Sequence, residues 1–209
     1  MPKLLHIAAS PRAGESFSMQ LAEAFLAAFT KAHREYGVET LDLFDTDLPE
    51  FRAPQAAAKY SVLDGQEPRG EAARAWKAVI EVIDNFKSAD FLLISSPMWN
   101  FSIPYRLKQY IDIIVQPGLT FSYEPATGYK GLVTGRPTVL ALARGGSYAP
   151  GSGSEAYDMQ RPYLEGILRF IGFSDIRTLL VDSTLAGPEE AAKSLTAARA
   201  KAVELAQNF

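Results

Sequence analysis

The 209-residue chain contains no cysteine and only two histidines, His6 and His33. The absence of cysteine excludes disulfides, thiolate metal sites, iron–sulfur clusters and cysteine nucleophiles. A zinc centre would then depend almost entirely on carboxylates, so we expect no metal site. His6 falls within a predicted strand and His33 near the end of a predicted helix, which favours packing or surface roles for both.

Long apolar runs and long basic runs are also missing. No stretch approaches the ~20 apolar residues of a membrane span, and the apolar patch at residues 4–9 is too short for a secretion signal. A net charge of -3 without a basic cluster argues against nucleic acid or an anionic membrane as a partner. We therefore expect a soluble, cytoplasmic protein.

Three familiar motifs are absent as well. The chain has neither the P-loop pattern Gly-x-x-x-x-Gly-Lys nor the dinucleotide pattern Gly-x-Gly-x-x-Gly. It also lacks Gly-x-Ser-x-Gly, so a serine hydrolase is poorly supported. These absences argue against nucleoside triphosphates and dinucleotides as tightly bound ligands, and they leave a mononucleotide open.

What is present is an ordinary globular composition, with 47% apolar and 22% charged residues. No repeat, low-complexity tract or linker divides the chain, so we predict a single domain over residues 1–209. Short apolar runs bounded by turn residues predict five strands, at residues 3–9, 38–42, 91–94, 138–143 and 174–181. Ser95, Ser96 and Pro97 are expected to end the third strand.

Apolar residues at helical spacing lie between these strands. They predict a helix carrying Leu21, Phe25 and Phe29, and further helices at residues 71–87, 104–115, 156–171 and from 188 onward. Pro104 suits the first turn of its helix, and Ser102 is the expected N-cap. Residues 43–70 are expected to hold a short helix near 55–60, and residues 120–133 a loose hairpin. Alternating strands and helices predict a doubly wound parallel sheet with helices on both faces.

The loop after the first strand is rich in hydroxyl groups. It carries Ser10, Ser16 and Ser18 around Gly14, immediately before a helix. The free N–H groups and the dipole of a helix N-terminus favour a phosphate there. The alternative is that Ser16 or Ser18 simply caps the helix. Three serines in one strand-to-helix turn favour the phosphate.

The loop after the third strand is rich in aromatic residues, and the loop after the fourth strand is rich in glycine. The first of these contains, in order, Pro97, Met98, Trp99, Asn100 and Phe101. Ligands of open α/β sheets bind at the carboxyl ends of the strands, so this loop suits a flat, π-rich ligand.

The loop after the fourth strand begins with Arg144, Gly145 and Gly146. Its glycines either make a tight turn or let backbone N–H groups approach a ligand. Arg144 either contacts a ligand or pairs with a carboxylate, and we favour the pairing. Right-handed crossovers bring all three loops to one edge of the sheet. A phosphate site, an aromatic surface and backbone donors together match flavin mononucleotide (FMN).

These residues resemble the FMN-dependent NADH-azoreductases, a flavodoxin-like family related to quinone reductases. The resemblance spans nearly the whole chain and is most specific in four segments: Ser10 with Ser16, Phe17 and Ser18; Pro97 to Phe101; Gly131 to Gly135; and Arg144 to Gly146. It implies FMN phosphate at the first loop, the isoalloxazine ring against the second, and the pyrimidine edge of the ring near Ala143 to Gly146. Two departures stand out, because the family commonly has Tyr at Trp99 and Ser at Ala143.

The resemblance also implies an activity. NADH or NADPH would reduce bound FMN, and a quinone or an azo compound would then be reduced at the same site in a ping-pong reaction. No catalytic side chain is required, and the backbone N–H groups of Gly145 and Gly146 would stabilise charge on the reduced flavin. Candidates for an apolar substrate pocket are Phe121, Tyr123 and Phe170.

Members of this family are homodimers with their active sites near the subunit interface. Four apolar residues either serve that interface or are buried within one subunit: Leu107, Tyr110, Ile111 and Ile114.

Two rivals to a reductase fit the sequence less well. A flavodoxin-type electron carrier would be shorter and more acidic than this chain. A phosphatase of similar layout would need a cysteine nucleophile in the first loop, which the chain lacks.

Overall fold

The computed structural model describes all 209 residues. One sheet contains five strands: β1 (Lys3–Ala8), β2 (Gly37–Asp42), β3 (Phe91–Pro97), β6 (Thr138–Ala143) and β7 (Ile176–Val181). Their order is β2-β1-β3-β6-β7, and every neighbouring pair is parallel. The chain winds outward from β1 to β2, then crosses back to β3 and continues the other way. The predicted doubly wound parallel sheet is confirmed.

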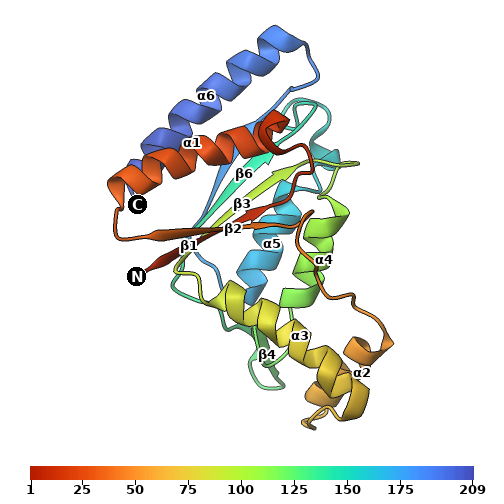
Figure 1. Ribbon diagram of the computed structural model, residues 1–209. Helices are drawn as coiled ribbons and strands as arrows, with labels where there is room; N and C mark the ends of the chain where they lie inside the picture. Colours follow the sequence, from red (N-terminus) through yellow and green to blue (C-terminus); the bar gives the residue numbers. More distant parts are fainter.

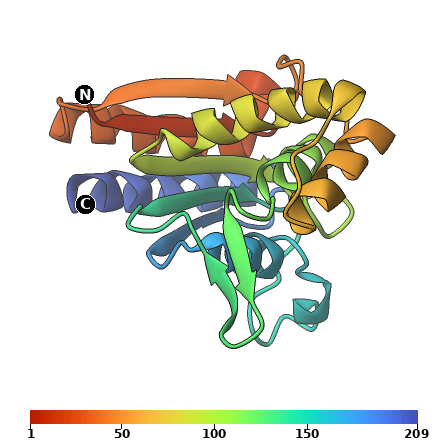
Figure 2. The same cartoon turned by 90° about the horizontal axis from the view of Figure 1, so that it is seen from below.

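Helices cover both faces of this sheet (Figures 1 and 2). On one face lie α1 (Phe17–Ala32) and α6 (Pro188–Gln207). The other face carries α3 (Gly70–Lys87), α4 (Tyr105–Ile114) and α5 (Arg161–Ile171), with α2 (Ala53–Leu63) beside α3.

A hydrophobic core lies on each face of the sheet. The central strand β3 contributes side chains to both cores, because successive strand residues point to opposite faces. Leu92 and Ile94 join the core beneath α3, α4 and α5, whereas Phe91 and Leu93 join the core beneath α1 and α6. Burial on both faces is why residues 91–94 form a continuous apolar run.

A two-stranded hairpin lies outside the main sheet, as the sequence predicts. It consists of β4 (Phe121–Glu124) and β5 (Gly128–Gly131), paired antiparallel. It connects the end of α4 to the start of β6, and both of these lie at the amino edge of the sheet. Val133, just after the hairpin, donates its N–H to the carbonyl of Ile171 at 2.9 Å and so ties the hairpin to the end of α5.

Several predicted boundaries are wrong. β3 continues through Ser95 and Ser96 to Pro97, and it can do so because Ser95 Oγ finds buried partners in His6 and Met19. The expected N-cap, Ser102, instead pairs with Trp99, and Pro104 occupies the N-cap position of α4.

Two helix boundaries also differ from the prediction. α2 is longer than residues 55–60, and α5 begins at Arg161 rather than near 156. The start of α5 is set by Asp158, whose Oδ1 accepts the N–H groups of Gln160 and Arg161 at 3.2 and 3.1 Å.

Candidate active site

The carboxyl edge of the sheet carries a pocket formed by the loops that follow β1, β3, β6 and β7. The structure brings residues from all three predicted loops together there. The pocket is lined by Ser10, Arg12, Ser16, Phe17, Pro97, Met98, Trp99, Ala143, Gly145, Thr184 and Leu185. Thr184 and Leu185 were missed by the sequence reasoning. Because β7 is parallel to its neighbours, the loop after it also had to reach this edge, and that signal could have found them.

The first loop places its serines at the start of α1. Ser16 occupies the N-cap position, but its hydroxyl lies 3.0 Å from the hydroxyl of Ser18 and caps no helix N–H. The N–H groups of Phe17, Ser18 and Met19 therefore have no acceptor within the protein. Paired hydroxyls beside free amides at a helix N-terminus form a suitable binding site for a phosphate.

The second loop is a two-residue turn. Trp99 and Ser102 exchange N–H···O hydrogen bonds, each 2.9 Å long, so that Asn100 and Phe101 form the tip. Both tip residues have positive φ, +47° and +67°, which is uncommon for a residue as large as phenylalanine. The carbonyl of Phe101 accepts the N–H of Met159 at 3.0 Å, and the N–H of Asn100 has no protein acceptor. The turn thus presents a free donor next to Trp99, which lines the pocket.

Aromatic side chains flank this turn on both sides. Trp99, which is 37% exposed, contacts Phe44 and Tyr105 at ring-centroid distances of 5.9 and 6.3 Å. Phe101 stacks on Tyr157 at 5.1 Å. Tyr157 was not predicted from the sequence, since it lies in a short 3-10 helix, Glu155–Tyr157, far along the chain.

The third loop has free backbone donors. The carbonyls of Gly145 and Gly146 accept the N–H groups of Leu185 and Ser183 at 3.1 and 3.2 Å, whereas the N–H groups of both glycines have no acceptor in the protein. Two fixed carbonyls with two free amides suit a ligand edge that carries hydrogen-bond acceptors. The methyl group of Ala143 also lines the pocket.

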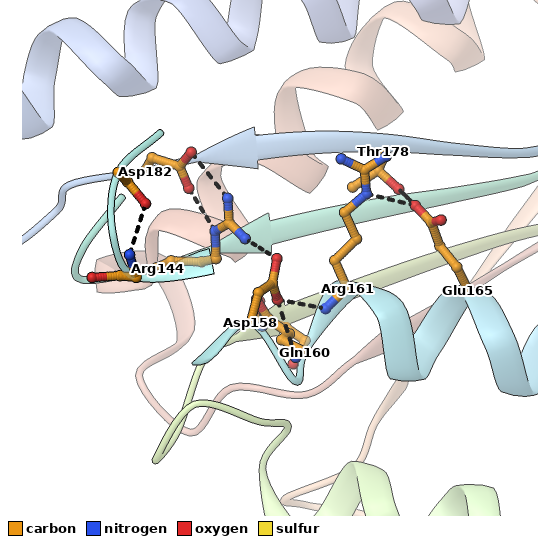
Figure 3. A network of polar contacts seen from close by, with 10 residues as sticks. Arg144, Asp158, Gln160, Arg161, Glu165, Thr178 and Asp182 are labelled. Carbon is orange, nitrogen blue, oxygen red and sulfur yellow. Dashed lines mark hydrogen bonds and ion pairs between the residues drawn. The ribbon is translucent and has the colours of Figure 1, made fainter. Parts of the chain in front are cut away.

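The Arg144 side chain points away from this edge and into an ion-pair cluster (Figure 3). It pairs with Asp158 and Asp182, as the preferred sequence interpretation expected. Burial by itself would lower the pKa of Arg144. The hydrogen bonds and charges of Asp182 and Asp158 outweigh burial, so the pKa lies above its usual value and the guanidinium stays charged.

The three residues predicted for a substrate pocket lie elsewhere in the chain. Phe121 and Tyr123 are on the β4–β5 hairpin and Phe170 is at the end of α5, where they line a separate groove that shares no residue with the first pocket. The four candidate interface residues on α4, Leu107, Tyr110, Ile111 and Ile114, are all buried in the core of the subunit.

No cluster of three or more histidine, aspartate or glutamate side chains is arranged to hold a metal ion. No helix is both long enough and apolar enough to cross a membrane. The pocket is instead a set of hydroxyls and backbone amides at one end, with an aromatic turn and backbone amides at the other. This donor set fits a ligand with one phosphate and one flat, hydrogen-bonding ring.

The fold and this site define a flavodoxin-like α/β protein. The family model described as "Flavodoxin-like fold" matches residues 2–206, and the chain belongs to this family.

Curated relatives match along the whole chain. An FMN-dependent NADH:quinone oxidoreductase of Nitratidesulfovibrio vulgaris is 50% identical over 213 residues, covering 100% of this chain and 98% of the relative. A protein of the same name from Desulfotalea psychrophila is 45% identical over 209 residues, with the same two coverages.

Solved structures agree with these relatives. An azoreductase from Bacillus anthracis superimposes with a TM-score of 0.91 at 31% identity, covering 100% of both chains. An FMN-dependent NADH-azoreductase from the same species, solved in complex with FMN, gives a TM-score of 0.85 at 27% identity, covering 99% of this chain and 100% of that one.

Proposed function

We propose that this protein is an FMN-dependent NADH:quinone oxidoreductase that also reduces azo compounds. The observation that carries the proposal is the set of backbone N–H groups without protein acceptors in the three loops that form the pocket, at residues 17–19 and at Asn100, Gly145 and Gly146. Free amides at a helix N-terminus suit a phosphate, and free amides in the other two loops suit the hydrogen-bonding edge of a flavin ring. The names of the relatives and of the solved structures support the same assignment.

When bound, FMN would supply the redox chemistry, which is two-electron transfer between a nicotinamide and an acceptor. The amides of residues 17–19 and the Ser16 and Ser18 hydroxyls would hold the phosphate. Gly145 and Gly146 would donate to the pyrimidine edge and stabilise negative charge that develops there. Trp99 and Phe101 would cover the ring and exclude water. No side chain has to act as an acid or a base.

The experiment begins with the visible absorption spectrum of the purified protein after incubation with FMN. Anaerobic titration with NADH, and separately with NADPH, should bleach the flavin rapidly. Addition of a benzoquinone or an azo dye should restore the oxidised spectrum. An electron carrier would bind FMN but would be reduced only slowly by NADH. A protein that retains no FMN would overturn the proposal.

We also propose that the protein is a homodimer. A monomeric protein rarely exposes a large contiguous apolar patch, and this chain exposes Leu63, Tyr123 and Tyr129 around one groove between α2 and the hairpin. Phe121, Tyr123 and Phe170 are separate from the pocket of their own subunit, so we place them in the substrate pocket of the partner. The proposed reductant, NADH, is an intracellular metabolite, which supports a cytoplasmic location.

A further inference from the structure

Arg144 lies at the centre of the loops that form the flavin site, yet it faces away from the pocket. Its side chain is 3% exposed and lies between two carboxylates from other segments (Figure 3). It binds Asp182 through two hydrogen bonds, Nε to Oδ1 at 2.6 Å and Nη2 to Oδ2 at 3.1 Å. Nη1 binds Oδ2 of Asp158 at 2.5 Å. The guanidinium thus joins the ends of β6 and β7 to the start of α5.

The network continues from Asp158 to the aromatic turn. Its second oxygen, Oδ1, accepts the N–H groups of Gln160 and Arg161. The buried Gln160 donates its side-chain N–H to the carbonyl of Ser96, at the end of β3, at 3.2 Å. Met159, between them, donates its N–H to the carbonyl of Phe101. Residues 158–161, which Arg144 anchors through Asp158, therefore also hold Phe101 at the tip of the turn after β3.

The backbone of Arg144 is fixed as firmly as its side chain. Its N–H donates to the carbonyl of Val181 at 2.9 Å. Its own carbonyl accepts both the N–H and the hydroxyl of Thr184, each at 3.1 Å. The next two N–H groups, those of Gly145 and Gly146, are the free ones. The position of these two donors is thus set by Arg144, whose N–H, carbonyl and guanidinium nitrogens all form hydrogen bonds.

Stability alone is a weak explanation for this cluster. Removing charges from water is costly, and a buried ion pair is often no more stabilising than well-packed apolar residues of similar size. A planar guanidinium that bridges two carboxylates does impose a fixed geometry, because its donors are arranged in a rigid fork. The cluster is therefore suited to setting the relative position of the loops.

We propose that Arg144 is a positioning residue for the flavin ring. Through Asp182 and Asp158 it holds the amides of Gly145 and Gly146, and the turn at Phe101, at the spacing that the pyrimidine edge of the ring requires. In this proposal Arg144 acts through its neighbours and does not itself contact the flavin. This inference rests on the proposed function, because it needs FMN at this edge.

The test compares FMN with riboflavin, which has the same ring but no phosphate. Arg144→Lys keeps the charge and loses the fork, so we expect it to weaken binding of both ligands by the same factor, roughly tenfold. It should also change the visible flavin spectrum. Ser16→Ala with Ser18→Ala, at the phosphate end, should weaken FMN binding and leave riboflavin binding unchanged. Binding is followed by quenching of flavin fluorescence.

The matched control is Arg177→Lys. Arg177 forms the same type of two-bond pair with Asp175, at 3.0 and 3.1 Å, but at the amino edge of the sheet. It should leave both affinities unchanged. Asp158→Asn and Asp182→Asn keep the shape of the cluster and replace Arg144→Lys if that variant does not fold.

If Arg144→Lys lowered the melting temperature but left both affinities and the flavin spectrum unchanged, the inference would be overturned. It would also be overturned if this variant bound FMN more weakly but riboflavin as tightly as the wild type. Failure of the wild-type protein to bind FMN would instead overturn the proposed function.

Discussion

At the scale of single residues, the polar group with the largest consequence for acid stability is His6. Its ring is buried in β1, with Nε2 2.9 Å from Ser95 Oγ and Nδ1 3.4 Å from Thr40 Oγ1. Burial lowers the pKa of His6 from 6.5 to about 4, against a smaller opposing effect of the Asp42 carboxylate. The folded protein therefore holds this imidazole neutral at a pH where the unfolded chain protonates it.

The sign of the resulting pH dependence follows from proton uptake. Between pH 6.5 and about 4, the unfolded state binds more protons at His6 than the folded state, so stability falls as the pH falls through this window. Between pH 7.5 and pH 5 we expect this group to remove about 2 kcal/mol from the free energy of unfolding.

Urea unfolding of the wild type and of His6→Gln at both pH values measures this contribution. The variant should lose about 2 kcal/mol less than the wild type on acidification. The matched change His33→Gln shows whether the effect belongs to the buried site. Parallel pH profiles for wild type and His6→Gln would contradict the assignment.

At this scale, the sequence indicated which types of residue form the site better than it indicated their interaction partners. Arg144 was expected to pair with a carboxylate, and it does, but neither Asp158 nor Asp182 could be identified because they are 14 and 38 residues away in the chain. The Ser16 hydroxyl was assigned either to a phosphate or to a helix cap, and its contact with Ser18 leaves the helix amides free. Tyr157 gave no signal, since its contact with Phe101 arises only in the folded chain.

At the scale of secondary-structure elements, the hairpin depends on a close backbone contact. A Cβ added to Gly131, the last residue of β5, would overlap backbone atoms of Ile171 and Gly172 at the end of α5. Backbone cannot move aside as a flexible side chain can. We therefore expect Gly131→Ala to reduce the free energy of unfolding by roughly 2–3 kcal/mol.

The control is Gly166→Ala, in the middle of α5, where a Cβ would meet nothing within 4 Å. This change should stabilise the protein by roughly 0.5–1 kcal/mol, because alanine is the better helix former. Chemical unfolding of the two variants measures both effects. A Gly131→Ala variant as stable as the wild type would show that the hairpin does not depend on this contact.

Elements buried on both faces were the easiest to predict. Residues 91–94 of β3 and 139–143 of β6 are continuously apolar because their side chains enter both cores, and the existence of both strands was confirmed. Boundaries set by tertiary contacts were missed. Buried partners for Ser95 lengthen β3, and the Asp158 carboxylate delays the start of α5. Neither contact leaves a periodic signal in the sequence.

At the scale of the whole molecule, the three aromatic residues at the amino edge raise a question of assembly. Phe121, Tyr123 and Phe170 were predicted to line the substrate pocket, yet their groove is separate from the pocket of the same subunit. A single subunit cannot bring the two together without rearranging the fold. The proposed dimer resolves this if each pocket uses the aromatic residues of its partner, which a sequence read as one chain could not reveal.

Mixed dimers provide a direct test of a shared site. Ser16→Asp should disable the flavin side, because aspartate is a good N-cap whose carboxylate repels the phosphate. The pair Phe121→Ala and Phe170→Ala should disable the aromatic side. Each homodimer should then reduce quinone poorly. In a heterodimer, one of the two pockets combines the intact flavin side of one subunit with the intact aromatic side of the other.

If equal amounts of the two variants exchange subunits at random, half of the dimers are mixed and each has one intact site, so quinone reduction should recover to about a quarter of the wild-type rate. The control is a mixture of Ser16→Asp with Val203→Lys, a change on the outer face of α6 that leaves an intact subunit. This mixture should reduce quinone at about half of the wild-type rate whether or not the site is shared, which checks that mixing itself does not alter the rate. If each subunit instead formed a complete pocket by itself, both sites of the first heterodimer would be defective. With heterodimer formation verified by native mass spectrometry, a mixture no more active than the separate variants would exclude sharing of the site between subunits.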